Sequence, residues 1–238
     1  MWHKAAEEVG VSIIGGHTGY SANLSRPLVA VTALGPLGDQ SPVLTRGAKP
    51  GDLILVTKGI ALEGTGILAY DFAGTARALG LGETEITAAE HLMSQVSIIP
   101  EALLLAKNGA SAMHDVTSGG LLETLLEMAE LSEVGFLVDY DSIPMPPVAV
   151  RFAEAIQFDP LRMISSGTLV AALPPEHLAA VSSAFDQAGI RFSVIGEVLE
   201  GKGVTVTRGE EETCYLTVQP EEDELARMWE MYAPDHTD

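Results

Sequence analysis

Two short glycine-containing segments carry residues whose types and spacing could do chemistry: GGHT at residues 15–18 and HDVTSGG at residues 114–120. Glycine has no side chain, so its backbone N–H can come close to an anion. Threonine and serine hydroxyls donate further hydrogen bonds, and the carboxylate of Asp115 offers oxygen ligands of the kind that Mg²⁺ prefers. The two segments therefore predict a binding site for a nucleotide or a phosphorylated small molecule. The predicted binding residues in them are Gly15, Gly16, His17, Thr18, Asp115, Thr117, Ser118, Gly119 and Gly120.

The second segment leads directly into the apolar run LLETLLEM at residues 121–128, which predicts a helix. The N-terminus of a helix has unpaired N–H groups and binds anions readily. Each segment also has a simpler interpretation, since Gly-Gly-x-Thr is a common turn sequence and Asp115 or Ser118 can serve only to cap the helix. Likewise, His17 can bond to the backbone of its own turn, and His114 can pack without touching a ligand.

The charge balance bears on possible partners. The chain has 33 acidic and 13 basic residues and a formal net charge of −20. Such a surface repels nucleic acid and anionic membranes, so the sequence predicts neither as a partner. An anionic ligand would have to be met by local positive potential from backbone N–H groups, a bound cation or one of the few lysines. Lys58 is the lysine we add to the predicted binding residues, because it follows the predicted strand at residues 53–57.

Length and composition describe a chain that can bury a sizeable core. Its 238 residues are 47% apolar and 19% charged. The single cysteine, Cys214, excludes an internal disulfide and fits a reducing compartment. It lies in the alternating run ETCYLTV, typical of a strand, which favours a structural role over that of a nucleophile. The sequence shows neither an apolar stretch of transmembrane length nor a signal-peptide pattern, and we expect a cytoplasmic protein.

Helices and strands alternate irregularly along the rest of the chain. This order predicts an α/β or α+β fold with a mixed sheet. The predicted strands cover residues 53–57, 112–114, 135–140, 167–173, 192–198, 204–207 and 212–218, and the predicted helices cover residues 61–72, 86–95, 100–108, 121–128, 148–156, 175–188 and 221–232.

The first 34 residues are harder to assign. They predict a helix at residues 2–9 and strands at residues 11–14 and 27–34, followed by a breaker-rich junction at residues 35–39. This is too little for a domain and too elaborate for a tail, and it is typical of the last part of a domain. Unpaired strands need to be covered, so we expect a second copy of the chain or a partner to do so, with a homodimer as the first choice.

Four motifs in one order resemble the superfamily of aminoimidazole ribonucleotide (AIR) synthetase, or PurM-like proteins, and within it the HypE-like and AIR synthase-related branch. The superfamily also includes selenophosphate synthetase, thiamine-monophosphate kinase and formylglycinamidine ribonucleotide synthetase. The motifs are GGHT at residues 15–18, GDLILVTK at residues 51–58, HDVTSGGL at residues 114–121, and the stretch from Asp159-Pro160-Leu161 to Ser166-Gly167-Thr168-Leu169. The resemblance covers nearly the whole chain.

The resemblance implies a fold and a chemistry. Residues 1–38 would be the end of a mixed-sheet N-terminal domain that pairs in a dimer, and residues 39–238 would be a complete C-terminal α/β domain. Family enzymes bind ATP with Mg²⁺ between the two domains, and most activate a small molecule by phosphoryl transfer. Gly15, Gly16 and Thr18 would line the phosphates from the first domain, Asp115, Thr117, Ser118, Gly119 and Gly120 would line them from the second, and His17 would touch a ligand or a metal.

Two departures from the family pattern leave an alternative open. The acidic Mg·ATP motifs of the N-terminal domain have no counterpart in this sequence, and no Gly-x-x-x-x-Gly-Lys-Ser/Thr loop replaces them. The sequence ends in YAPDHTD, without the C-terminal cysteine through which HypE acts, and the nucleophile region of selenophosphate synthetase is not recognisable either. The alternative is a non-catalytic protein that keeps the fold and serves as a dimerising or partner-binding module.

Overall fold

The computed structural model describes residues 2–20, 22, 24, 27–36, 41–217 and 223–232. It divides into two units, Met1–Pro42 and Val43–Asp238. The first unit contains helix α1 (Trp2–Glu8), and the second contains all the strands among the described residues. No helix in the described ranges is long and apolar enough to cross a membrane.

A mixed sheet of seven strands organises the second unit, in the order β2-β4-β1-β5-β3-β6-β7. Neighbouring strands are antiparallel except for β3 and β6, which are parallel. The strands are β1 (Leu53–Thr57), β2 (Ala112–Asp115), β3 (Gly135–Asp139), β4 (Leu169–Leu173), β5 (Phe192–Leu199), β6 (Gly203–Arg208) and β7 (Glu211–Tyr215). The central strand β1 pairs on both sides, with Leu55 opposite Ala171 of β4 and Val194 of β5.

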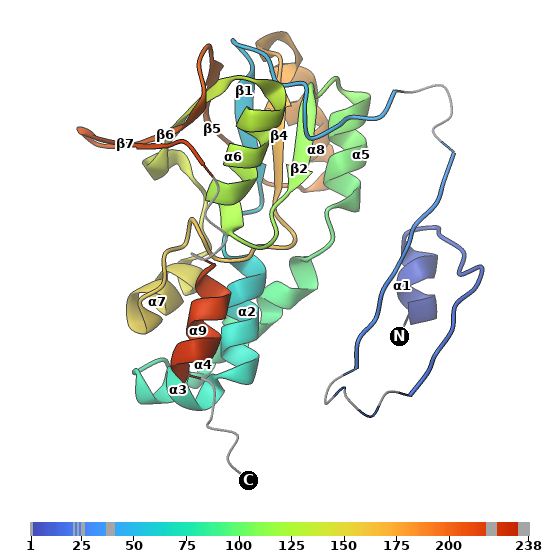
Figure 1. Ribbon diagram of the computed structural model, residues 1–238, viewed down its shortest axis with the longest axis vertical. Coiled ribbons are helices and arrows are strands. Elements are labelled where there is room, and N and C mark those ends of the chain that lie inside the picture. The colour runs from blue at the N-terminus through green and yellow to red at the C-terminus, as the bar shows by residue number, and fades with distance from the viewer. Residues whose placement is uncertain are drawn as a thin grey trace. The chain divides into compact units, whose positions relative to one another are not determined.

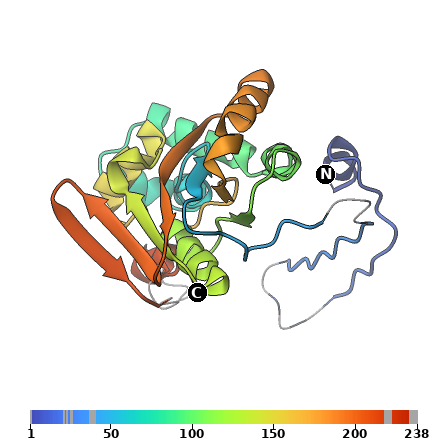
Figure 2. The same ribbon diagram turned by 90° about the horizontal axis from the view of Figure 1, so that it is seen from above.

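Side-chain alternation along the central strands builds a core on each face of the sheet. Ile54 and Val56 of β1 pack in the cluster that contains the apolar face of helix α6 (Gly120–Ser132). Leu55 points to the opposite face, into a cluster formed with helices α5 (Ile99–Lys107) and α8 (Leu178–Ala188). Figures 1 and 2 show α6 on one side of the sheet and α5 and α8 on the other. Burial on both faces explains why β1 and β4 are almost entirely apolar.

A third cluster holds a group of helices together beyond one end of the sheet (Figure 1). Its members are α2 (Leu62–Asp71), α3 (Ala73–Ala78), α4 (Glu83–Glu90), α7 (Pro147–Ile156) and α9 (Glu224–Tyr232). The C-terminal helix α9 is anchored there by the fully buried Met228 and by an edge-to-face contact between Trp229 and Phe72, whose ring centroids are 4.7 Å apart. Residues as far apart in the sequence as Phe72 and Trp229 therefore share one small core.

The structure confirms the mixed-sheet α/β fold and most of the predicted elements. The predicted strand at residues 53–57 is β1 with the same bounds, and Cys214 lies in strand β7 as expected. Two predicted helices contain a 3-10 turn. The one at residues 86–95 begins at Glu83 and ends as a 3-10 turn, η1 (His91–Gln95), and the one at residues 175–188 opens with the 3-10 turn η3 (Pro175–His177).

The predicted strands at residues 11–14 and 27–34 are wrong, because both segments lack strand structure. A strand exists only through hydrogen bonds to a neighbour, and the described residues of the first unit contain helix α1 but no pairing strand. Both segments are mostly apolar, but an apolar sequence does not supply a pairing partner. The helix predicted at residues 2–9 is confirmed as α1.

Candidate functional site

The second glycine segment forms a tight loop between strand β2 and helix α6. Val116 N–H donates to the carbonyl of Thr168 over 3.0 Å, which continues the pairing of β2 with β4 by one residue. Gly120 N–H then donates to the carbonyl of Thr117 over 3.1 Å, which closes the turn. The side chains of Thr117 and Ser118 are exposed at its tip. The loop thus presents two hydroxyl groups beside the first turn of a helix.

Gly120 fixes the position of this loop because no larger residue fits there. Its φ is +68°, and a Cβ atom on it would lie 2.5 Å from the carbonyl oxygen of Leu161 and 2.8 Å from that of Met163. Leu122 N–H donates to the same Leu161 carbonyl over 2.9 Å. The start of α6 is therefore pressed against the backbone of residues 161–163.

Three buried hydroxyl groups tie the end of strand β1 to the beginning of β4. Thr57, Ser165 and Thr168 have no solvent exposure. The hydroxyls of Ser165 and Thr168 are 2.7 Å apart, and Leu62 N–H donates to Ser165 Oγ over 3.1 Å. The Thr168 hydroxyl donates to the carbonyl of Gly59, and Leu169 N–H donates to Thr57 Oγ1. Because buried polar groups are costly when unpaired, this network specifies the path of residues 57–62.

Lys58 leaves β1 in a left-handed conformation, with φ +57°. Its ammonium group lies 2.9 Å from Oε1 of Glu101, and it donates to the carbonyls of Gln95 and Ser97 over 2.9 and 2.6 Å. An ammonium group has three donors, and these three oxygens of the chain account for them. Lys58 as a ligand-binding residue stays a prediction, because an anion would have to replace one of these oxygens.

His114 links the end of β2 to helix α6. Its Nδ1 atom is 2.8 Å from the carbonyl oxygen of Asp115 and 3.4 Å from Oδ1 of the Asp115 side chain. Its Nε2 atom is 2.9 Å from Oε2 of Glu127. Hydrogen bonding to the Asp115 side chain raises the pKa of His114, and the same contact lowers the pKa of Asp115. Because its pKa is lowered, Asp115 is an ionised carboxylate at neutral pH. Its side chain is 53% exposed.

Sequence reasoning missed two acidic groups beside the loop. Glu123 lies on the first turn of α6, and burial together with the charges of Glu127 and Asp223 raises its pKa. The four-residue spacing of Glu123 and Glu127 places them on one face of the helix and could have been read from the sequence. Asp223 accepts a hydrogen bond of 3.0 Å from the N–H of Gly119, which lies 104 residues earlier in the sequence. No local sequence pattern predicts that contact.

The first glycine segment lies in the other unit. Gly15, Gly16, His17 and Thr18 occupy irregular structure in the first unit, so their role as a partner of the loop at residues 115–120 stays a prediction. Within the second unit, the structure brings Asp115, Thr117, Ser118, Gly119 and Gly120 together in one loop. Among the described residues no group of three His, Cys, Asp or Glu side chains could hold a metal ion.

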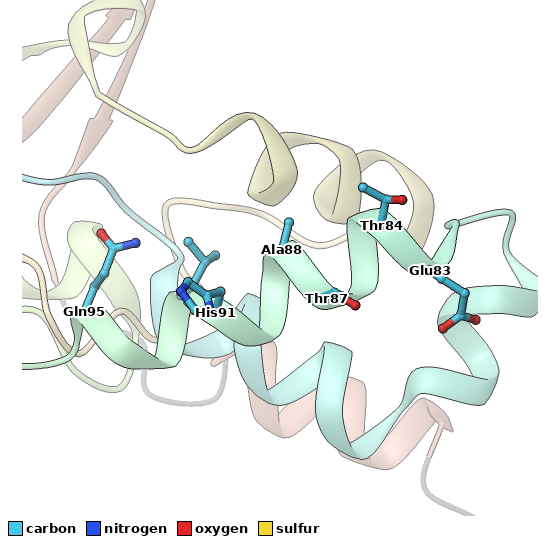
Figure 3. Close-up of a pocket in the computed structure, with 7 residues that line it drawn as sticks. Glu83, Thr84, Thr87, Ala88, His91 and Gln95 are labelled. Carbon is cyan, nitrogen blue, oxygen red and sulfur yellow. The ribbon is translucent and has the colours of Figure 1, made fainter.

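Two cavities lie away from this loop. One, of about 610 Å³, is lined only by residues of the helical run from α4 to η1, including Glu83, Thr87 and His91, and is therefore a surface hollow (Figure 3). A second, of about 600 Å³, is lined by Lys58, Arg191 and other residues at the end of β1. Neither is lined by a residue of the loop at residues 115–120.

The match to a known family agrees with this geometry. The family model of the AIR synthase related protein, C-terminal domain, matches residues 49–209. The range begins just before strand β1 and includes the glycine loop, the hydroxyl network and the stretch that contacts Gly120. The chain belongs to this family.

Curated relatives in the family include enzymes of different names. The chain is 29% identical over 209 residues to carbamoyl dehydratase HypE of Rhizobium leguminosarum bv. viciae, covering 82% of this chain and 55% of the relative. It is 32% identical over 211 residues to thiamine-monophosphate kinase of Pyrococcus horikoshii, covering 87% of this chain and 60% of the kinase. The chain spans about half the length of the HypE relatives it matches.

Solved structures share the fold. The crystal structure of E. coli HypE, a hydrogenase maturation protein, matches with a TM-score of 0.63 at 25% identity, covering 78% of this chain and 55% of that one. A crystal structure of hydrogenase maturation protein HypE in complex with ATP matches with a TM-score of 0.55 at 20% identity, over 76% of this chain and 55% of that one. At that identity the second likeness shows the fold alone.

The close approach at Gly120 generates a stability prediction. We expect Gly120→Ala to lower the free energy of unfolding by at least about 3 kcal/mol, because the new Cβ meets carbonyl oxygens in addition to the positive φ. Gly189→Ala is the matched control, since Gly189 has φ +67° with no atom within 4 Å of the added Cβ. It should cost only about 1–2 kcal/mol. Urea denaturation measures both, and equal losses would show that the contact at Gly120 is not restrictive.

The buried ion pair of Lys58 and Glu101 leads to a second stability prediction. Glu101→Leu should lower the free energy of unfolding by about 3–5 kcal/mol, because it leaves the largely buried Lys58 ammonium without a counter-charge. Lys58→Met combined with Glu101→Leu should recover most of that loss. Glu154→Gln, which removes an exposed partner of Arg151, should cost less than about 1 kcal/mol. A double variant as unstable as the single one in urea denaturation would contradict the pairing.

His114 leads to a third prediction, which concerns the pH dependence of stability. A group whose pKa is raised by folding stabilises the protein fully below its unfolded pKa of about 6.5, and that contribution is lost as pH rises through the folded pKa. Between about pH 6 and about pH 9, the wild type should therefore lose more stability than His114→Gln. His91→Gln removes an exposed histidine with no ion pair among the described residues and should keep the wild-type dependence. The prediction fails if the wild type and His114→Gln show the same pH dependence of urea denaturation.

Proposed function

We propose that this chain is part of an ATP-dependent phosphoryl-transfer enzyme and that the loop at residues 115–120 contacts the phosphates of the nucleotide. The observation that carries the proposal is the loop itself. It holds an ionised, half-exposed carboxylate at Asp115 and exposed hydroxyls at Thr117 and Ser118, next to the N-terminus of α6, in a turn that Gly120 fixes. The kinase among the relatives supports the reaction type.

The exposed hydroxyls of Thr117 and Ser118 are the donors that the loop offers to phosphate, at the N-terminus of α6. The helix dipole adds a positive potential at this end. Such local donors are needed, because the chain carries a formal net charge of −20 and would otherwise repel an anion. Phosphoryl transfer depends on positioning and charge stabilisation, which a rigid loop provides.

Asp115 would hold Mg²⁺ together with the nucleotide. Magnesium in nucleotide sites is usually bound by one or two carboxylates, with phosphate oxygens and water completing its shell. One exposed carboxylate with a lowered pKa fits that pattern, although the described residues offer no group of three ligands. The metal would neutralise phosphate charge, and Asp115 would fix its position at the end of β2.

Residues 1–38 would complete the site as the end of the N-terminal domain, with residues 39–238 as the C-terminal domain. Under this proposal Gly15, Gly16 and Thr18 contact phosphate from the other side, and His17 touches the ligand or the metal. The ATP complex of the HypE structure with the same fold agrees with a nucleotide in this family. We also propose a cytoplasmic location, because a chain with a single cysteine cannot form an internal disulfide.

A second candidate function is a dimerising or partner-binding module. One observation favours it: large apolar side chains of the first unit are exposed within that unit, for example Ile14 at 89% and Leu34 at 85%. Contiguous exposed apolar residues mark interaction sites. A homodimer that covers them is compatible with nucleotide binding, whereas a purely structural module predicts no nucleotide affinity.

Mg·ATP titration tests the proposed function. We expect a saturating rise in melting temperature, equivalent to about 2.7 kcal/mol of stabilisation at a hundredfold excess over Kd. Asp115→Asn should abolish most of the rise. Asp141→Asn is the matched control, because it removes an exposed aspartate just after β3, with three strands between β3 and β2. No shift in the wild type, or the same shift in Asp115→Asn, would reject the proposed role of the loop.

A further inference from the structure

A carboxylate of the chain itself occupies the backbone of the proposed phosphate loop. Oδ2 of Asp223 accepts a hydrogen bond from Gly119 N–H over 3.0 Å. Its other oxygen, Oδ1, accepts from Ala226 N–H over 2.8 Å and so caps the N-terminus of helix α9. One side chain therefore joins the last helix of the domain to the glycine loop.

This contact occupies a donor that a phosphate would use. Gly119 is buried and immediately precedes α6, where the helix dipole favours negative charge. A carboxylate that accepts an N–H bond at this position makes the same interaction as a phosphate oxygen. The Asp223 carboxylate and a phosphate oxygen cannot both form a full-strength hydrogen bond with the single amide proton of Gly119.

The groups around Asp223 weaken its hydrogen bond from Gly119, so a more strongly charged anion can replace it. Glu123 of α6 lies close enough for the charge of Asp223 to contribute to its raised pKa, while Arg162 lowers that pKa. Repulsion between the carboxylates of Glu123 and Asp223 opposes the Gly119 bond. Asp223 also lines an open cavity of about 530 Å³ with Arg162 and Arg227, so there is space beside it.

Replacement does not require α9 to leave the domain. Met228 is fully buried, Trp229 packs on Phe72, and Arg227 donates to the carbonyl of Gln157 over 2.6 Å. These contacts hold the middle of the helix. Rotation of the Asp223 side chain alone frees the Gly119 N–H, at the cost of its hydrogen bonds from Gly119 and Ala226.

We propose that Asp223 is a built-in competitor that occupies the Gly119 N–H of the empty site and must be displaced by a phosphate group of the nucleotide. This inference rests on the proposed function. The bound nucleotide would gain the donor, while α9 would lose its bond to the loop. The helix itself would stay in place, and the strength of the Asp223–Gly119 contact would set how far the affinity for nucleotide is reduced.

Calorimetric titration with Mg·ATP, and separately with pyrophosphate, tests the competition. The variants are Asp223→Asn and Asp223→Ser, because asparagine and serine are both favourable N-caps and preserve the start of α9. Each removes the charge that holds the Gly119 bond. Glu230→Gln is the matched control, since it removes one negative charge from an exposed position on the same helix.

We expect both Asp223 variants to bind each ligand about five- to tenfold more tightly than the wild type, since a site that is only fractionally open binds more weakly by that fraction. Glu230→Gln should change the affinity less than about twofold, because an exposed charge is screened. Equal or weaker binding by the Asp223 variants, with the wild type binding normally, would overturn the competition and leave the proposed function standing. Absence of binding in all four proteins would overturn both.

Discussion

The structure depends on one close approach, that of Gly120 to the backbone of residues 161–163. Helix α6 can begin where it does only because position 120 has no side chain and a positive φ. The same stretch of backbone continues into Ser165 and Thr168, whose hydroxyls bind the loop that follows β1. A contact between two backbones thus sets the positions of three loops at one end of the sheet. Any ligand site here has a rigid base, and only exposed side chains are left to move.

The net charge of the chain explains why the loop needs this rigid backbone support. A chain with a net charge of −20 gains little from long-range attraction of anions, so recognition must come from donors at short range. The loop supplies them, yet Glu123, Glu127 and Asp223 crowd the same region with carboxylates. Asp223 accepts a hydrogen bond from Gly119, and His114 lies between the carboxylates of Asp115 and Glu127, which it partly neutralises when it is protonated. Polar groups beside the loop are thus bonded to side chains of the chain itself.

The sheet could be predicted from sequence because its strands are buried on both faces and leave an unmistakable apolar pattern, as in β1. The glycine loop could be predicted because its residues are contiguous. Residues 11–14 and 27–34 carry the same apolar pattern but form no strand, since pairing is a property of two segments and not of one. Asp223 and Glu101 escaped prediction for a related reason: each acts across a long sequence distance, on Gly119 and Lys58, where no local pattern records the contact.

The central claim is that the loop between β2 and α6 receives the phosphates of a nucleotide. The most direct measurement is the ¹H–¹⁵N NMR spectrum of the ¹⁵N-labelled chain during titration with Mg·ATP. We expect that, within residues 43–238, the largest changes occur at the amides of residues 117–121, with smaller changes at the start of α9. The claim would be contradicted if these amides stayed unchanged while others moved, for example those of the α4 and η1 surface hollow, or if no amide moved at saturating nucleotide.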